Sequence, residues 1–234
     1  MWSGPRNIST ALMRSFENRP DSVVSDEPFY AHYLYKTSTD HPLRNKIIGR
    51  ENTDWQKVVA EITGPIPGGK SIWYQKHMAQ HNLPGCDLGW VEYFTNCILI
   101  RNPNDVMLSY LEKFEISSSD QLGYQQQVDL YNFLNNMGNT PLILDATDIL
   151  KNPQKMLKKL CDQLDIPFYT EMLSWPAGPR DSDGIWGHHW YGNVETSTGF
   201  QSYTKKKGKF PSKYQDIYTA SMEHYKKLYS DRLQ

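Results

Sequence analysis

Residues near the start of the chain could bind an anion, because a basic side chain and two hydroxyls follow a Gly-Pro turn there. Arg6 stands directly after that turn, and Ser9 and Thr10 open an amphipathic segment that runs to Phe16. Backbone N–H groups at the start of a helix lack intrahelical partners, and the helix dipole adds positive potential there. The segment therefore predicts a phosphate-type site with these side chains as added donors. An ordinary helix start with a capping hydroxyl is the alternative.

A second arginine and serine farther along the chain repeat this chemistry. Residues 96–100 are apolar enough for a buried strand, which ends on Arg101, and Pro103 then begins a helix that carries Ser109. Arg101 is thus expected at the carboxyl end of a strand, with Ser109 close by on the next helix. These two side chains suit a second phosphate.

Together the two runs resemble those of PAPS-dependent sulfotransferases, PAPS being 3'-phosphoadenosine 5'-phosphosulfate. Residues 5–10 are similar to the family's 5'-phosphosulfate loop, Pro-Lys/Arg-Ser-Gly-Thr/Ser-Thr, with Asn7 and Ile8 in place of Ser and Gly. The spacing from Arg101 to Ser109 is similar to the 3'-phosphate motif, an Arg with a Ser eight positions on. Residues 144–161 resemble the strand and helix that follow, so the resemblance spans almost the whole chain.

Within this superfamily the chain is most similar to bacterial sulfotransferase-like proteins related to branched-chain aminotransferase fusions. The resemblance implies a set of residues that hold PAPS, namely Arg6, Asn7, Ser9, Thr10, Arg101, Ser109, Lys206, Lys207 and Gly208. The last three resemble an Arg/Lys-Lys-Gly element that closes over PAPS, although a solvated basic loop is the alternative. Sulfuryl transfer needs in-line geometry and fixed cations around the leaving phosphate, so no metal is expected.

The resemblance also implies the catalytic residues, which are Arg6, Lys76, Glu27 and His81. Lys76 follows the apolar residues 72–74, so its ammonium is expected near the sheet edge, beside the bridging oxygen of the transferred group. Relatives deprotonate the acceptor with a glutamate after the second strand or with a histidine beyond the lysine. Glu27 is our first choice of base and His81 our second, ahead of His77. A solvated turn around Glu27 and structural histidines are the alternatives.

An aromatic run at residues 185–191 is expected to line the acceptor pocket or to fold over the nucleotide. Trp186, Trp190 and Tyr191 would then favour small, cationic alcohols, because aromatic faces attract ammonium groups. His188 and His189 are adjacent but have no further ligands at suitable spacing, so we expect no metal site.

Alternating strands and helices must position these residues. Helices are expected near residues 10–18, 54–62, 105–115, 121–137, 153–164 and 212–233, and strands near 23–25, 71–75, 98–100 and 142–144. This alternation predicts an α/β, three-layer P-loop-like fold with a central mainly parallel sheet flanked by helices, and with ligands at the carboxyl ends of its strands. Only Met1 and Trp2 precede the first loop, so the first strand is expected to be very short or abbreviated.

Composition adds broader expectations. A chain of 234 residues suits one sulfotransferase-like domain over residues 1–234. The net charge of −1 gives no reason to expect nucleic acid, and the apolar runs are strand-sized, so no membrane partner is expected. The three cysteines form no C-x-x-C pair, which favours reduced thiols and a cytoplasmic location. The oligomeric state is not indicated.

We therefore predict an enzyme that transfers a sulfuryl group from PAPS to a hydroxyl or amine of a small-molecule acceptor. A P-loop-type nucleotide-dependent kinase or phosphotransferase is one alternative. The chain lacks the Walker A glycine-lysine pair and a clear magnesium-binding aspartate, which counts against it. The second alternative is a non-catalytic relative that binds a nucleotide. Ile8, which replaces the Gly of the family's loop, leaves this alternative open.

Overall fold

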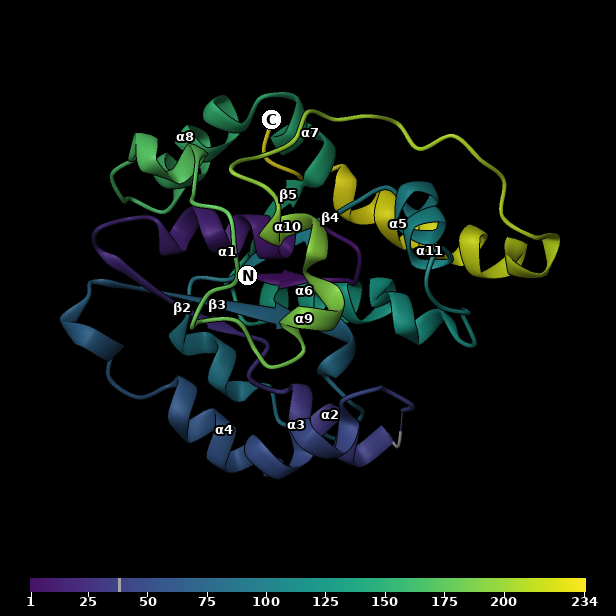
Figure 1. The fold of residues 1–234 in the computed structure, drawn as a ribbon, viewed down its shortest axis with the longest axis horizontal. Helices are drawn as coiled ribbons and strands as arrows, with labels where there is room; N and C mark the ends of the chain where they lie inside the picture. Colours follow the sequence, from purple (N-terminus) through teal and green to yellow (C-terminus); the bar gives the residue numbers. More distant parts are fainter. Residues whose placement is uncertain (38) are drawn as a thin grey trace.

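The computed structural model describes residues 1–37 and 39–234, and these form a five-stranded parallel sheet with helices on both faces (Figure 1). The spatial order is β2-β3-β1-β4-β5. The strands are β1 (Trp2–Ser3), β2 (Ser22–Asp26), β3 (Ile72–Met78), β4 (Cys97–Ile100) and β5 (Leu142–Asp145). Each pair of neighbours is parallel, which confirms the predicted α/β class.

Strand β4 is apolar on both faces, as expected for a parallel strand that is covered on both sides. Successive side chains alternate between the faces. In β4, Ile98 and Ile100 join one hydrophobic core, while Leu99 joins the other together with Leu144 of β5. The sheet therefore separates two cores, each closed by its own layer of helices.

Helices pack on each face and around one end of the sheet. One core holds side chains of α1 (Ser9–Glu17), α7 (Ala146–Lys151) and α8 (Pro153–Gln163). The other holds those of α4 (Trp55–Ile62), α5 (Pro103–Tyr110), α6 (Tyr124–Asn136) and α11 (Gln215–Tyr229). A smaller cluster joins α2 (Tyr30–Thr37) and α3 (Arg44–Arg50) to the region of α9 (Gly187–Trp190) and α10 (Gly192–Glu195).

The central strand is short, as expected from the sequence. Trp2 pairs with His77 of β3 and Ile98 of β4, and Ser3 pairs with the residues that follow them. Because β1 lies between β3 and β4, the loop after Ser3 leaves from the middle of the carboxyl edge. That loop is therefore surrounded by the ends of the neighbouring strands.

The fold differs from the sequence-based expectation in several places, among them strand β3 and the short helices α2, α3, α7, α9 and α10. Strand β3 continues to Met78, so Lys76 lies inside the strand rather than after it. Helices α2 and α3 were not predicted; they are short and rest on packing against one another and against Trp186 and Tyr191. No helix in the described part of the chain is both long and apolar enough to cross a lipid bilayer.

Candidate active site

The loop between β1 and α1 bends tightly at the carboxyl edge of the sheet. A Cβ atom on Gly4 would lie 2.5 Å from the carbonyl oxygen of Leu122, so no side chain fits there. Arg6 has a positive φ of 54°. The side chain of Asn7 donates to the carbonyl of Leu99 over 2.9 Å and accepts from the N–H of Ile8. Asn7 thus supports the loop through its own side chain.

Helix α1 begins directly after this bend and has no side-chain cap. Ile8 occupies the capping position and offers no acceptor, so the N–H groups of the first turn are left for another partner. Thr10 and Ala11 of that turn line the adjoining cavity. The start of α1 is therefore suited to an anion.

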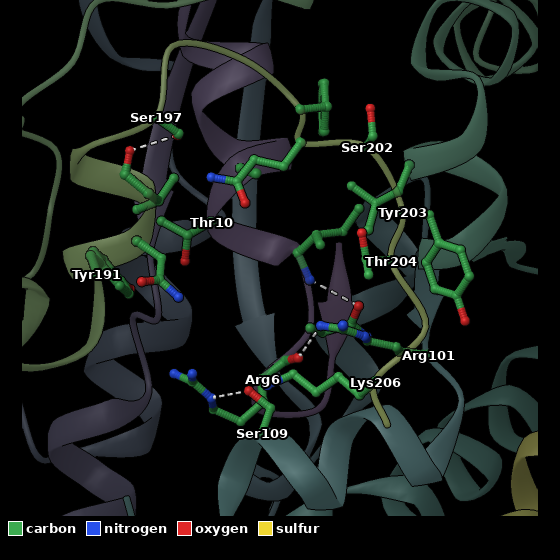
Figure 2. Close-up of a pocket in the computed structure, with 18 of the residues that line it drawn as sticks. Arg6, Thr10, Arg101, Ser109, Tyr191, Ser197, Ser202, Tyr203, Thr204 and Lys206 are labelled. Atoms are coloured by element: carbon green, nitrogen blue, oxygen red, sulfur yellow. Dashed lines mark hydrogen bonds between the residues drawn. The ribbon is translucent and has the colours of Figure 1, made fainter. Parts of the chain in front are cut away.

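Two arginines and a serine meet beside this helix start (Figure 2). Arg101 Nη1 donates to the backbone oxygen of Arg6 over 2.8 Å, and Arg6 Nε donates to Ser109 Oγ over 3.0 Å. Burial lowers the pKa of Arg6, and the neighbouring charge of Arg101 lowers it further, while Glu112 opposes this. Holding two guanidinium groups so close costs electrostatic energy that a bound polyanion would offset.

A cavity of about 350 Å³ opens in front of this group. Its lining carries three cations, Arg6, Arg101 and Lys206, against one carboxylate, Glu112, which is ion-paired with Lys206. Lys207, in contrast, is exposed, and neither it nor Gly208 is among the lining residues. Of the basic loop predicted to close over the nucleotide, the structure brings Lys206 alone to the cavity.

Lys76 lies at the neighbouring position of the sheet edge, with its ammonium surrounded by acceptors. The strand register places it beside Asp26. Its Nζ atom is 2.8 Å from Asp26 Oδ1, 2.6 Å from Glu27 Oε1 and 2.6 Å from the hydroxyl of Tyr191. An ammonium has three donors, so all three are used here.

The charges of this cluster shift its pKa values. Burial acts to lower the pKa of Lys76, but the two carboxylates outweigh it and raise that pKa, so the ammonium stays charged. Burial raises the pKa of Glu27, although the charge of Lys76 opposes the shift. A carboxyl group with a raised pKa is a better proton acceptor.

His81 also reaches this cluster, whereas His77 does not. His81 Nε2 lies 4.0 Å from Glu27 Oε2, and its ring stacks against those of Tyr30 and Tyr33. Burial and the charge of Lys76 lower the pKa of His81 to about 3, so the ring is neutral. His77 stacks on Trp2 instead and bonds Gln75, away from the loop.

A second cavity, of about 460 Å³, lies over Glu27 and Lys76 and shares lining residues with the first. Ser9, Thr10 and His81 line it, and its aromatic lining consists of Tyr30, Tyr33, Tyr110, Phe114, Trp190 and Tyr191. Trp186 is not part of the lining, contrary to the sequence-based expectation. It is buried behind Tyr191 and donates its indole N–H to that hydroxyl over 3.1 Å.

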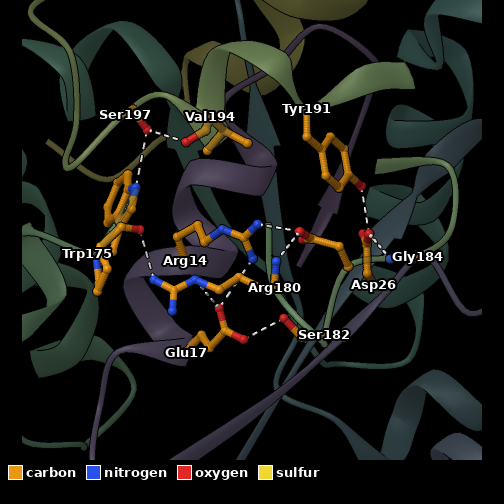
Figure 3. Close-up of polar contacts among 12 residues, drawn as sticks. Arg14, Glu17, Asp26, Trp175, Arg180, Ser182, Gly184, Tyr191, Val194 and Ser197 are labelled. Carbon is orange, nitrogen blue, oxygen red and sulfur yellow. Dashed lines mark hydrogen bonds and ion pairs between the residues drawn. The ribbon is translucent and has the colours of Figure 1, made fainter. Parts of the chain in front are cut away.

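The segment that carries Tyr191 is bound to α1 by a buried ion pair (Figure 3). Arg14, which is only 1% exposed, lies 2.6 Å from Asp183 and 3.3 Å from Glu17. The next N–H group, that of Gly184, donates to Asp26. A Cβ atom on Gly184 would lie 2.0 Å from the Trp186 ring, so the ring folds over this position only because it is glycine.

Three residues of this arrangement were not singled out from the sequence, namely Asp26, Arg14 and Asp183. Asp26 precedes Glu27 at the end of β2, where a solvated turn was the alternative interpretation of the sequence. The side chain of Asp26 is only 1% exposed, so it does not face solvent. The adjacent pair of carboxylates after an apolar strand was the available signal. For the other two, the sequence offers no local signal.

Across residues 1–37 and 39–234, no three His, Cys, Asp or Glu side chains are arranged to hold a metal ion. The neighbours His188 and His189 belong to α9, and His189 contacts His41 and Phe114.

A five-stranded parallel sheet flanked by helices, with a basic loop at its carboxyl edge, defines an α/β protein. The sulfotransferase domain family matches residues 1–232, and the chain belongs to that family. This confirms the resemblance drawn from the sequence motifs.

Two curated relatives come from Arabidopsis thaliana. Branched-chain-amino-acid aminotransferase-like protein 2 is 39% identical over 216 residues, which are 92% of this chain and 38% of that protein. Branched-chain-amino-acid aminotransferase-like protein 1 is 38% identical over 229 residues, which are 98% of this chain and 41% of that protein. The chain thus spans about two fifths of the length of these relatives.

A solved sulfotransferase domain shares the fold at low sequence identity. The domain from the Synechococcus PCC 7002 olefin synthase is 12% identical with a TM-score of 0.52, over 100% of this chain and 94% of that chain. The domain from the curacin biosynthetic pathway is 16% identical with a TM-score of 0.48, over 96% of both chains.

Proposed function

We propose that the chain transfers a sulfuryl group from PAPS to a hydroxyl or amine of a small molecule. The observation that carries this proposal is the excess of cations around the first cavity, where Arg6, Arg101 and Lys206 face a single carboxylate. A donor with a 5'-phosphosulfate and a 3'-phosphate supplies two separated anionic groups to balance them.

The two anionic groups would occupy the two ends of the loop region. Arg6, Thr10 and the free N–H groups at the start of α1 would hold the phosphosulfate, since they converge beside β1. Arg101 and Ser109 would hold the 3'-phosphate. Asn7 would contribute by fixing the loop, because both ends of its side-chain amide are bonded within it.

Transfer would take place where the two cavities meet. The acceptor oxygen attacks sulfur, the bond from sulfur to the bridging phosphate oxygen breaks, and the acceptor proton passes to a base. Glu27 suits this role because it lines the second cavity and burial raises its pKa. His81 suits it less, since a ring with a pKa of about 3 binds protons weakly at neutral pH.

Lys76 would act through its charge and as an anchor. Its three N–H groups are bonded to Asp26, Glu27 and Tyr191, so none is directed at the bridging oxygen. We therefore assign it to orienting Glu27 while adding positive potential at the point of transfer.

A transfer assay tests this proposal. The full chain is incubated with PAPS carrying labelled sulfur and a pool of small alcohols and amines, and in parallel with γ-labelled ATP and Mg²⁺. We expect labelled organic sulfate from PAPS, and a strong loss of it in Arg6→Ala but not in Arg50→Ala, a change at an exposed position of α3. Phosphorylated product from ATP without organic sulfate would contradict the proposal.

A further inference from the structure

We propose that the acceptor carries a positively charged ammonium group in addition to the hydroxyl or amine that reacts. This inference rests on the proposed function, because it treats the second cavity as the acceptor site. It is drawn from the charges and the aromatic side chains around that cavity.

The reactive end of the second cavity has more negative than positive charge. Asp26 and Glu27 share one ammonium, that of Lys76, so this buried group carries a net negative charge when both carboxylates are ionised. Arg6 borders the cavity as well, but it also faces the first cavity, where donor phosphates would neutralise it. His81 is neutral and adds no positive charge.

Other residues that line the second cavity are aromatic or acidic. Trp190 packs against Phe114 in a tilted arrangement, at 4.7 Å between ring centroids, and donates its indole N–H to His41 over 2.9 Å. Burial lowers the pKa of His41 to about 4, so this ring is neutral too. Asp40 follows in the lining, and among the described residues no basic side chain lies within ion-pair distance of it.

Glu115, the remaining carboxylate of the lining, does not change this balance. It is paired with Lys213 over 2.9 Å at the surface, so its charge is matched outside the cavity. The lining has no basic side chain besides Arg6 and Lys76 within residues 1–37 and 39–234. An acceptor with its own carboxylate or phosphate would therefore find no free cation to bind it.

An ammonium group fits these surroundings. Aromatic rings attract cations through their electron-rich faces, and the attraction is strongest where water is excluded. With the reacting hydroxyl at Glu27, an ammonium elsewhere on the acceptor would lie in a cavity that is also lined by the rings of Tyr33, Phe114 and Trp190 and by the carboxylate of Asp40. The acceptor class inferred here is thus an amino alcohol, including its quaternary forms.

The test compares pairs of alcohols that differ in one charge. Choline is matched with 3,3-dimethyl-1-butanol, and tyramine with 4-propylphenol. Calorimetry measures the binding of each to the full chain, with and without adenosine 3',5'-bisphosphate. In at least one pair we expect the cation to bind about tenfold more tightly than its neutral partner.

A variant on the same helix as Tyr33 supplies the control. Tyr33→Leu and Asp40→Asn should each reduce the preference for the cation, whereas Tyr35→Leu should not, because Tyr35 is 55% exposed and outside the lining. Tyr33→Leu removes one of the two rings stacked on His81, so its folding is checked by circular dichroism. Asp40 is exposed, so Asp40→Asn provides an independent measurement of the preference for the cation if Tyr33→Leu does not fold.

Equal or tighter binding of the neutral partner in both pairs would overturn the inference, and so would the absence of binding by all four compounds. Neither outcome tests the donor site, which is tested by the binding of adenosine 3',5'-bisphosphate alone. Failure of the bisphosphate to bind would instead count against the proposed function.

Discussion

The hydroxyl of Tyr191 lies 2.6 Å from the ammonium of Lys76, although the two residues are 115 positions apart in the chain. The same hydroxyl donates to Asp26 Oδ2 over 2.7 Å and accepts from the indole of Trp186. Tyr191 therefore links the C-terminal part of the chain to the ends of β2 and β3. It fixes the directions of both the ammonium and the Asp26 carboxylate.

Removing this hydroxyl should weaken the fold measurably. In Tyr191→Phe, a buried donor of Lys76 and a buried oxygen of Asp26 each lose a partner, which costs about 1–3 kcal/mol of the free energy of unfolding. Urea denaturation measures this, with Tyr35→Phe as the control because that ring is largely exposed. An unchanged unfolding free energy in Tyr191→Phe would show that water replaces the hydroxyl without cost.

Breaking the buried ion pair between Arg14 and Asp183 should lower the free energy of unfolding by more than the loss of the Tyr191 hydroxyl does. Arg14→Met leaves Asp183, whose side chain is 7% exposed, without its main cation, and we expect a loss of about 3–5 kcal/mol. The double variant Arg14→Met/Asp183→Leu should recover part of that loss, because no unpaired charge remains. A double variant less stable than Arg14→Met would contradict this account of the pair. Urea denaturation of both variants decides the point.

Much of the fold was predictable because short sequence patterns mark where its strands and helices begin and end. The apolar runs of β4 and β5, the proline at the start of α5 and the asparagine cap of α8 are each short local signals that mark an element or its boundary directly. Lys76 was misplaced relative to β3 because charged residues normally end an apolar strand. Here Asp26 of the neighbouring strand balances its charge inside the sheet.

The candidate site was predictable where it consists of loops with short motifs. Arg6 and Arg101 each follow a strand, and the parallel sheet brings their strands together, so the motif positions were sufficient. Tyr191 and Asp183 could not be assigned in this way. Their partners are Asp26, Lys76 and Arg14, and the contacts depend on how a long irregular segment crosses α1, which no local pattern specifies.

The choice of base predicts different behaviour for two variants. Glu27→Gln keeps the shape of the side chain but loses its proton affinity, so kcat should fall by roughly 10²–10⁴-fold with donor affinity unchanged. His81→Asn should act mainly on acceptor binding, because His81 packs against Tyr30 and Tyr33 in the lining of the second cavity. Steady-state kinetics with a sulfated product as readout separates the two. The reverse pattern would identify His81 as the base.

Stability should fall in acid partly because of His81. Its pKa is about 3 in the folded chain, through burial and the charge of Lys76, against an ordinary value of 6.5. Between these values the unfolded chain binds a proton that the folded chain does not, so the free energy of unfolding decreases as the pH falls through that range. His81→Gln should reduce this slope between about pH 6.5 and about pH 4, measured by urea denaturation at several pH values. Equal slopes for both proteins would show that His81 does not contribute.

The two phosphate subsites should be separable by one substitution. Arg101→Ala should weaken the binding of adenosine 3',5'-bisphosphate by roughly 1.5–3 kcal/mol while leaving AMP nearly unchanged, because a charge-assisted contact to the 3'-phosphate is lost. Arg50→Ala, at an exposed position of α3, is the control. Equal losses for both nucleotides would show that Arg101 does not lie at the 3'-phosphate.

The most direct measurement for the donor site is calorimetry of the unaltered chain with adenosine 3',5'-bisphosphate in the presence of a chelator. Arg6, Arg101 and Lys206 supply the positive charge of the first cavity without help from a metal. We therefore predict binding that is independent of divalent cations, tighter than that of AMP, and tighter than that of ATP with Mg²⁺ measured without the chelator. Binding of ATP with Mg²⁺ in preference to the bisphosphate, or no binding of the bisphosphate at all, would contradict the account.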